Sequence, residues 1–85
     1  MKYDSDDVAQ YGKRYRCAEI ESAIMRSYPK AIEVHLFQHF TFVLFKTKAV
    51  RFATSPTLLD LLVRHEAGEE VKDGAAFSLD PVVTN

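Results

Sequence analysis

Residues 31–53 read AIEVHLFQHFTFVLFKTKAVRFA, and this stretch decides the fold. Within it, apolar residues alternate with other residues over 32–37, 40–45 and 49–53. A period of two is typical of β-strands, because successive side chains point to opposite faces of a sheet. The short connections between the three segments predict an antiparallel meander with segment 40–45 in the centre.

The register of this meander follows from the need to bury one apolar face. A two-residue turn at Gln38-His39 would place Thr41 on the same face as Leu36. A three-residue connection pairs Leu36 with Phe40 instead, and a second one at 46–48 joins the third segment. We expect this latter register. It gathers the following side chains on one face: Ile32, Val34, Leu36, Phe40, Phe42, Leu44, Val50 and Phe52.

The segment before the meander has a helical pattern over residues 4–28. Ser5 is a suitable N-cap, but the apolar spacing rotates near Gly12, a residue type that is unfavourable inside helices. We expect either a kinked helix or a short arm followed by a helix from about Arg14. Pro29 ends this helix, because proline disfavours the helical conformation of the residue before it.

The segment after the meander begins with Ser55-Pro56, a hydroxyl N-cap followed by proline at the first helical position. Leucines and a valine over 58–63 supply a broad apolar face, and Gly68 predicts the helix end. Farther on, residues 72–74 predict a turn between short extended pieces at Val71 and Phe77.

This order predicts a two-layer α-β-β-β-α domain of the α+β class over residues 1–80, followed by a frayed tail at 81–85. Both helices are expected on one face of the three-stranded antiparallel meander. The order is similar to that of the double-stranded RNA-binding domain and of small toxin ribonucleases of the HicA type. Residues 55–60 do not have the lysine-rich start that the RNA-binding domain uses, and Gln38-His39-Phe40 does not match the toxin histidine segment. The similarity therefore implies a layout and no activity.

Composition narrows the class of protein further. The 85 residues include eleven basic and twelve acidic side chains, for a formal net charge of −1, whereas general polyanion binders are strongly basic. Cys17 is the only cysteine, so no internal disulfide forms and a cytoplasmic location is expected. No apolar run approaches the length of a membrane span, so we expect no membrane association.

The second face of the predicted sheet is too apolar for a solvent-facing surface, because it carries Phe37, Val43 and Phe45 beside Arg51. Exposed apolar patches often mark interaction sites. We therefore expect this face to bind another protein, or a second copy of the chain in a homodimer. The alternative is that another segment folds over it.

A basic and aromatic cluster precedes the meander: Tyr11, Lys13, Arg14, Tyr15 and Arg16. Arginine and tyrosine are common anchors of protein interfaces, and they also bind phosphates and stack on nucleic-acid bases. A helix face on which Arg16 pairs with Glu19 is the simpler alternative.

Signatures of catalysis, metal binding and cofactor binding are missing from the sequence. His35 and His39 lie in a predicted strand and turn, where their side chains need not converge on a zinc ion. Cys17 follows the apolar line of Ile20 and predicts a buried thiol rather than a nucleophile. The leading hypothesis is a non-enzymatic protein-binding module that inhibits or regulates a larger protein. A nucleic-acid-binding regulator is the second hypothesis, and a ribonuclease using a histidine is the weakest.

Overall fold

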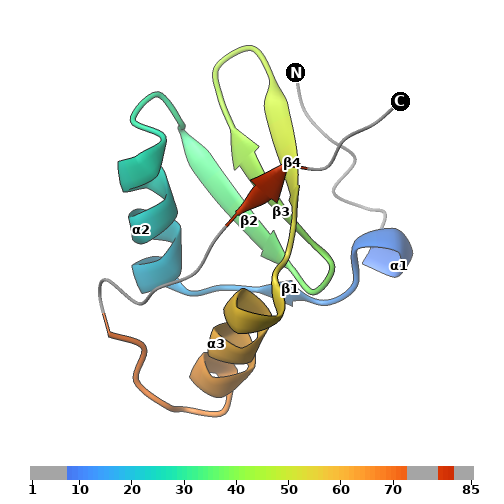
Figure 1. Ribbon diagram of the computed structural model, residues 1–85, viewed down its shortest axis with the longest axis vertical. Helices are drawn as coiled ribbons and strands as arrows, with labels where there is room; N and C mark the ends of the chain where they lie inside the picture. The colour runs from blue at the N-terminus through green and yellow to red at the C-terminus, as the bar shows by residue number, and fades with distance from the viewer. Residues whose placement is uncertain (1–7, 73–78, 82–85) are drawn as a thin grey trace.

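The protein is described by a computed structural model over residues 8–72 and 79–81 (Figure 1). Its elements, in chain order, are α1 (Val8–Tyr11), β1 (Arg14–Tyr15), α2 (Ala18–Ser27), β2 (Glu33–Phe37), β3 (Phe40–Leu44), β4 (Ala49–Ala53), α3 (Pro56–Glu66) and β5 (Asp80–Pro81). The strands form one antiparallel sheet in the order β1-β2-β3-β4-β5. The predicted α+β class is confirmed, and two-residue strands extend the predicted meander at both edges.

Helices α2 and α3 pack against the same face of the sheet, as the sequence predicts. Ile20 and Ile24 of α2 and Leu58 and Leu62 of α3 are at most 1% exposed. They belong to one buried cluster with side chains from β2, β3 and β4: Val34, Leu36, Val43 and Phe52. Burial of each such side chain contributes roughly 1.5–3 kcal/mol, so this layer supplies much of the stability of the domain.

The predicted register of the central strand is wrong by one residue. Leu36 pairs with Thr41, and Leu44 pairs with Ala49, so both connections are of the shorter kind. A one-residue slip exchanges the faces of a strand. As a result, Val43 faces the helices, while Phe42 lies on the opposite face of the sheet with Phe37 and Leu44.

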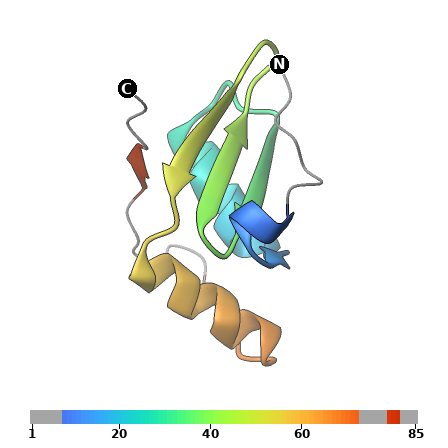
Figure 2. The ribbon, with the colours of Figure 1, turned by 90° about the vertical axis from the view of Figure 1, so that its right-hand side faces the viewer.

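The opposite face is not left bare, because α1 covers part of it (Figure 2). The Tyr11 ring lies 5.3 Å from that of Phe37 and 4.9 Å from that of Phe42, measured between centroids. These three side chains and Leu44 form a second buried cluster, against which Phe40 is packed. The sheet therefore has apolar packing on both faces, which is why the alternating pattern alone misassigned β3.

The N-terminal segment resembles the predicted short arm, with one difference. Gly12 has a φ of +81°, a conformation that ends α1, and the following Arg14–Tyr15 pair joins the sheet as β1. Helix α2 therefore begins at Ala18 rather than near Arg14. The predicted N-cap at Ser5 lies outside the described residues.

Helix α3 has the predicted start and end. The Leu58 N–H donates to Ser55 Oγ at 3.1 Å, and Pro56 takes the first helical position. Gly68 has a φ of +95°, and the N–H groups of Gly68 and Glu69 donate to the carbonyls of His65 and Arg64. This pair of bonds is a Schellman motif.

The C-terminal part is described only at residues 79–81. Pro81 was predicted to lie in the frayed tail, but it belongs to β5 and pairs with Phe52 of β4. The predicted turn beyond Lys72, the extended piece at Phe77 and the rest of the tail lie outside the described residues. Within the described part of the chain, no helix has the length and apolar character needed to cross a membrane.

Candidate protein-binding edge of the sheet

The outer edge of β2 is covered over only part of its length. β1 pairs with Phe37 and Leu36 and then ends, because the chain turns into α2 after Tyr15. The N–H of Gln38 donates to the carbonyl of Lys13 on this side. Since backbone groups alternate in direction along a strand, those of Val34 point to the same outer side. Among the described residues, no strand lies beside Val34 there.

A hollow of about 190 Å³ lies along this uncovered edge. Its lining comes from β1, α2, β2 and their flanks: Arg14, Arg16, Glu21, Met25, Ile32, Glu33, Val34 and His35. Consecutive residues of β2 contribute to it, so side chains from both faces of the sheet border the same space. Ile32 is 59% exposed, although the predicted register buried it.

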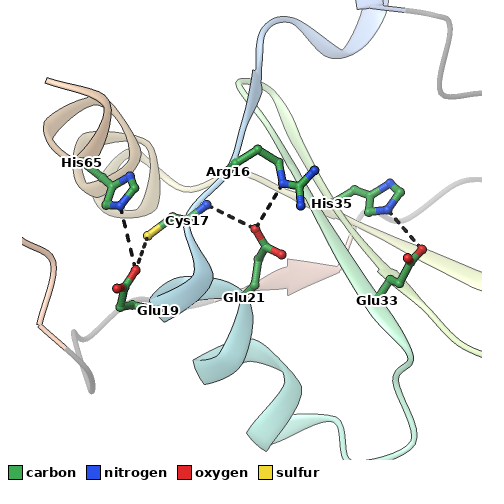
Figure 3. A network of polar contacts seen from close by, with 7 residues as sticks. All are labelled: Arg16, Cys17, Glu19, Glu21, Glu33, His35 and His65. Carbon is green, nitrogen blue, oxygen red and sulfur yellow. Dashed lines mark hydrogen bonds and ion pairs between the residues drawn. The ribbon is translucent and has the colours of Figure 1, made fainter. Parts of the chain in front are cut away.

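Charged side chains of both signs line the hollow. Figure 3 shows three of them, Arg16, Glu21 and Glu33. Glu21 Oε2 accepts from the Cys17 N–H at 3.2 Å and lies 3.9 Å from Arg16 Nε. Glu33 Oε2 lies 3.3 Å from His35 Nε2. Arg14 forms no ion pair with any described residue, and its guanidinium carbon lies 5.9 Å from the centroid of the Phe37 ring. Arg14 is therefore the cation at this edge whose charge is not compensated by a described carboxylate.

The surroundings of His35 lower its pKa and so favour its neutral form. Burial lowers its pKa from the ordinary value of 6.5, and the positive charge of Arg14 lowers it further. Glu33 and Glu21 act in the opposite direction and do not outweigh these effects.

At each edge of the sheet a two-residue strand covers only part of its neighbour: β1 pairs with Leu36 and Phe37 of β2, and β5 pairs with Phe52 and Ala53 of β4. At the far edge, β5 contains Pro81, which has no backbone N–H to donate. Proline at an edge is one of the devices by which proteins prevent further pairing. The uncovered part of β2, residues 33–35, contains no proline.

The predicted patch of Phe37, Val43 and Phe45 does not form a surface. Val43 is fully buried under the helices, and Phe37 is 1% exposed beneath Tyr11 on the other face. Phe45 packs against the helix-side cluster, with its ring 6.4 Å from that of Tyr28. The patch is absent because the one-residue change of register separates these residues. Arg51 is half-buried, with its guanidinium carbon 4.8 Å from the centroid of the Phe40 ring.

The basic and aromatic cluster is divided by the fold. Tyr11 and Tyr15 are 7% and 9% exposed and serve as core residues. Lys13 forms an ion pair with Glu66 at the end of α3. Arg14 and Arg16 are exposed and meet at the hollow, whereas the expected pairing of Arg16 with Glu19 is replaced by proximity to Glu21.

Among the described residues, the structure brings together one set of potential metal-ligating side chains that are not adjacent in the sequence. Cys17, Glu19 and His65 each direct a potential ligand atom toward a common point, and these atoms lie within 4.8 Å of one another (Figure 3). Burial raises the pKa of the Cys17 thiol above 9.0, so Cys17 does not have the lowered pKa of an activated nucleophile. His35 and His39 are not part of this set.

Comparisons with protein-family models, with curated proteins and with solved structures found no match to this chain.

Sequence reasoning missed Ile32 and Met25 as candidate binding residues. Ile32 belongs to the alternating pattern of β2, so it was assigned to the core. Ile32 lies immediately before β2, beyond the part of the strand beside which β1 lies, and its side chain is exposed there. No periodicity in the sequence carries this information, because it depends on where a distant segment stops.

Proposed function

We propose that this chain is a non-enzymatic protein-binding module that takes up an extended segment of another protein along the outer edge of β2. The observation that supports it is the uncovered stretch of β2 beside a hollow that contains an exposed isoleucine. Addition of a strand to a sheet edge is a recurring mode of peptide recognition. In this mode, main-chain hydrogen bonds supply affinity and alternate side chains supply specificity.

The backbone of β2 supplies the first requirement of this mode. Val34 directs its N–H and C=O away from β3, toward the side where β1 does not pair with them. Val34 is only 3% exposed, so side chains at the rim of the hollow have to move aside before a guest strand reaches these groups. An incoming strand would form hydrogen bonds there and would extend the order of the sheet beyond β2. The uncovered stretch is short, so backbone pairing by itself gives limited affinity, and side-chain contacts have to supply the rest.

The hollow supplies a place for one apolar side chain of the guest. Ile32 and Met25 line it, and Ile32 already exposes most of its surface. Removing apolar surface from water contributes about 25 cal/mol per Å², so an aliphatic guest side chain in contact with Ile32 gains affinity by burial. Val63, the other large apolar side chain that is markedly exposed among the described residues, lies on α3 and is not among the residues that line the hollow.

Arg14 defines the charge of the preferred guest. Its guanidinium lies at the rim of the hollow without a described carboxylate partner. Arginine binds a carboxylate through two parallel hydrogen bonds, which adds geometric specificity to charge. The guest is therefore an extended segment with an aspartate or glutamate close to an aliphatic residue. Binding of such a segment would inhibit or regulate the larger protein to which it belongs, because the segment could no longer make its contacts within that protein.

The test is selection of binding segments from a library of random linear peptides, followed by affinity measurements on variants. We expect selected peptides to combine an aliphatic with an acidic residue. Ile32→Asp should weaken their binding at least about tenfold, which corresponds to about 1.4 kcal/mol. Val63→Asp is the matched control, because it places the same charge on another exposed apolar position and should leave binding unchanged.

A second measurement tests the edge itself. Hydrogen exchange of the Val34 amide should slow when a selected peptide binds, because the guest strand would accept its hydrogen bond. Peptides that bind Ile32→Asp as well as the native protein, with no slowing at Val34, would refute the proposal. Salt-sensitive binding of RNA or DNA that is lost in Arg14→Ala and retained in Ile32→Asp would favour the nucleic-acid hypothesis instead.

A further inference from the structure

The second feature of interest is a set of three potential metal ligands between two helices. Cys17 is the N-cap of α2, Glu19 lies in the first turn of the same helix, and His65 lies in the last turn of α3 (Figure 3). Cys17 Sγ lies 3.5 Å from Glu19 Oε2, and His65 Nε2 lies 3.9 Å from the same oxygen. Glu19 and His65 are 46 positions apart in the chain, but the fold places their side chains next to each other.

These spacings are close to those of a tetrahedral zinc site. Zinc bonds of about 2.3 Å to sulfur and 2.0–2.1 Å to nitrogen or oxygen place the ligand atoms roughly 3.3–3.6 Å apart. The distance from Cys17 Sγ to Glu19 Oε2 already lies in this range, at 3.5 Å. The separation of His65 Nε2 from Glu19 Oε2 needs a contraction of about 0.5 Å. The separation of Cys17 Sγ from the His65 nitrogen needs at most about 1.2 Å, since all three ligand atoms lie within 4.8 Å of one another.

The burial of the three side chains is also suitable. Cys17 is 1% exposed, and its sulfur is therefore fixed by the surrounding core. The side chains of Glu19 and His65 are 47% and 35% exposed, so they are free to adjust their rotamers and to admit an ion from solvent. A fixed thiol below two adjustable surface ligands gives the ion both an anchor and a route of entry.

We propose that Cys17, Glu19 and His65 form a zinc-binding site that joins the start of α2 to the end of α3. The set of one sulfur, one nitrogen and one oxygen donor suits zinc, whereas magnesium and calcium prefer oxygen ligands alone. Three protein ligands leave the fourth tetrahedral position to water or to an external donor. This inference is independent of the proposed peptide-binding edge, because it shares no residue with the hollow beside β2.

The alternative arrangement is a hydrogen-bonded trio without metal. In it, the Cys17 thiol donates to Glu19, whose carboxylate also lies near His65. Metal binding and hydrogen bonding predict different spectra, so the two are separated by cobalt(II) as a probe. Cobalt takes the place of zinc in tetrahedral sites, and a coordinated thiolate gives it a charge-transfer band in the near ultraviolet.

The experiment is titration of the full chain with cobalt(II) and then zinc(II), under reducing conditions. We expect one cobalt ion per chain, tetrahedral visible bands, a thiolate charge-transfer band, and displacement of cobalt by zinc. Zinc should also raise the melting temperature, because it binds the folded chain in preference to the unfolded one. His65→Ala should lower the affinity for zinc at least about tenfold, and Glu19→Gln should weaken it as well.

Two variants make the result interpretable. Cys17→Ser removes the charge-transfer band, but it alters a core residue, so the surface variants His65→Ala and Glu19→Gln carry the test if Cys17→Ser fails to fold. His39→Ala is the matched control, because it removes an exposed histidine from the turn after β2. Absence of the charge-transfer band in the native protein, or equal loss of affinity in His39→Ala and His65→Ala, would overturn the proposal.

Discussion

The hydroxyl of Thr41 lies 3.1 Å from that of Thr54, on the helix-covered side of the sheet. Thr54 Oγ1 donates its own proton to the carbonyl of Phe37 at 2.8 Å, so Thr41 is the donor between the two hydroxyls. Thr41 is fully buried, and this chain of bonds satisfies its polar group. The relationship explains how a threonine occupies a core position that sequence reasoning reserved for an apolar residue.

Thr54→Val is expected to lower the free energy of unfolding by about 1–3 kcal/mol, because it leaves the buried Thr41 hydroxyl without its acceptor. The double variant Thr41→Val/Thr54→Val should recover part of this loss, since both polar groups are then gone. Urea denaturation of the two single variants and the double variant measures the coupling energy. Purely additive effects would mean that the two hydroxyls do not interact.

Gly12 should tolerate alanine much less well than Gly68. Both have positive φ angles, of +81° and +95°, which cost an L-residue roughly 1–2 kcal/mol. A Cβ at Gly12 would also lie 2.7 Å from Gln38 Cβ, whereas one at Gly68 meets nothing within 4 Å. Gly12→Ala should therefore cost at least about 1 kcal/mol more than Gly68→Ala, measured by thermal or urea unfolding. Equal costs would show that the N-terminal arm moves away from Gln38 without loss.

Ser55→Ala removes the N-cap of α3. The expected loss of stability is about 0.5–2 kcal/mol, because the Leu58 N–H loses the side-chain acceptor at 3.1 Å. Ser22→Ala, an exposed position inside α2, is the control and should not destabilise the protein. A comparable loss in both variants would assign the effect to something other than the cap.

The pKa of His35 makes stability depend on pH. Burial and Arg14 lower this pKa below 6.5, so the unfolded chain binds a proton more readily than the folded protein does. The neutral imidazole contributes fully to the free energy of unfolding above pH 6.5. This contribution is lost as the pH falls from 6.5 toward the lowered pKa of His35 in the folded protein. The free energy of unfolding should therefore decrease on acidification through this range.

His35→Gln should reduce this acid-induced loss, and His39→Gln provides the histidine control. Urea denaturation over a series of pH values gives the slope for each protein. If His35→Gln has the same slope as the native protein, His35 is not the source of the dependence.

Much of the local structure is predictable from neighbouring residues. Ser55, Pro56 and Gly68 mark the ends of α3, and Pro29 follows the end of α2, because caps and proline act over a few residues. The existence of β2, β3 and β4 follows equally well from alternation. The candidate site is different, because only Arg14 and Arg16 of the predicted partner-binding residues line the hollow.

The amino-acid sequence by itself determined the α+β class, the three main strands, both ends of α3 and the C-terminal end of α2, since these depend on interactions between residues close in the chain. The tertiary structure decided which face of β3 is buried. Apolar residues occupy both faces of that strand, so the choice rests on two distant partners, Tyr11 on one side and Thr54 on the other. The tertiary structure also decided which part of the β2 edge has no described strand beside it and which side chains lie near Cys17. Both depend on contacts between remote segments, which no local pattern encodes.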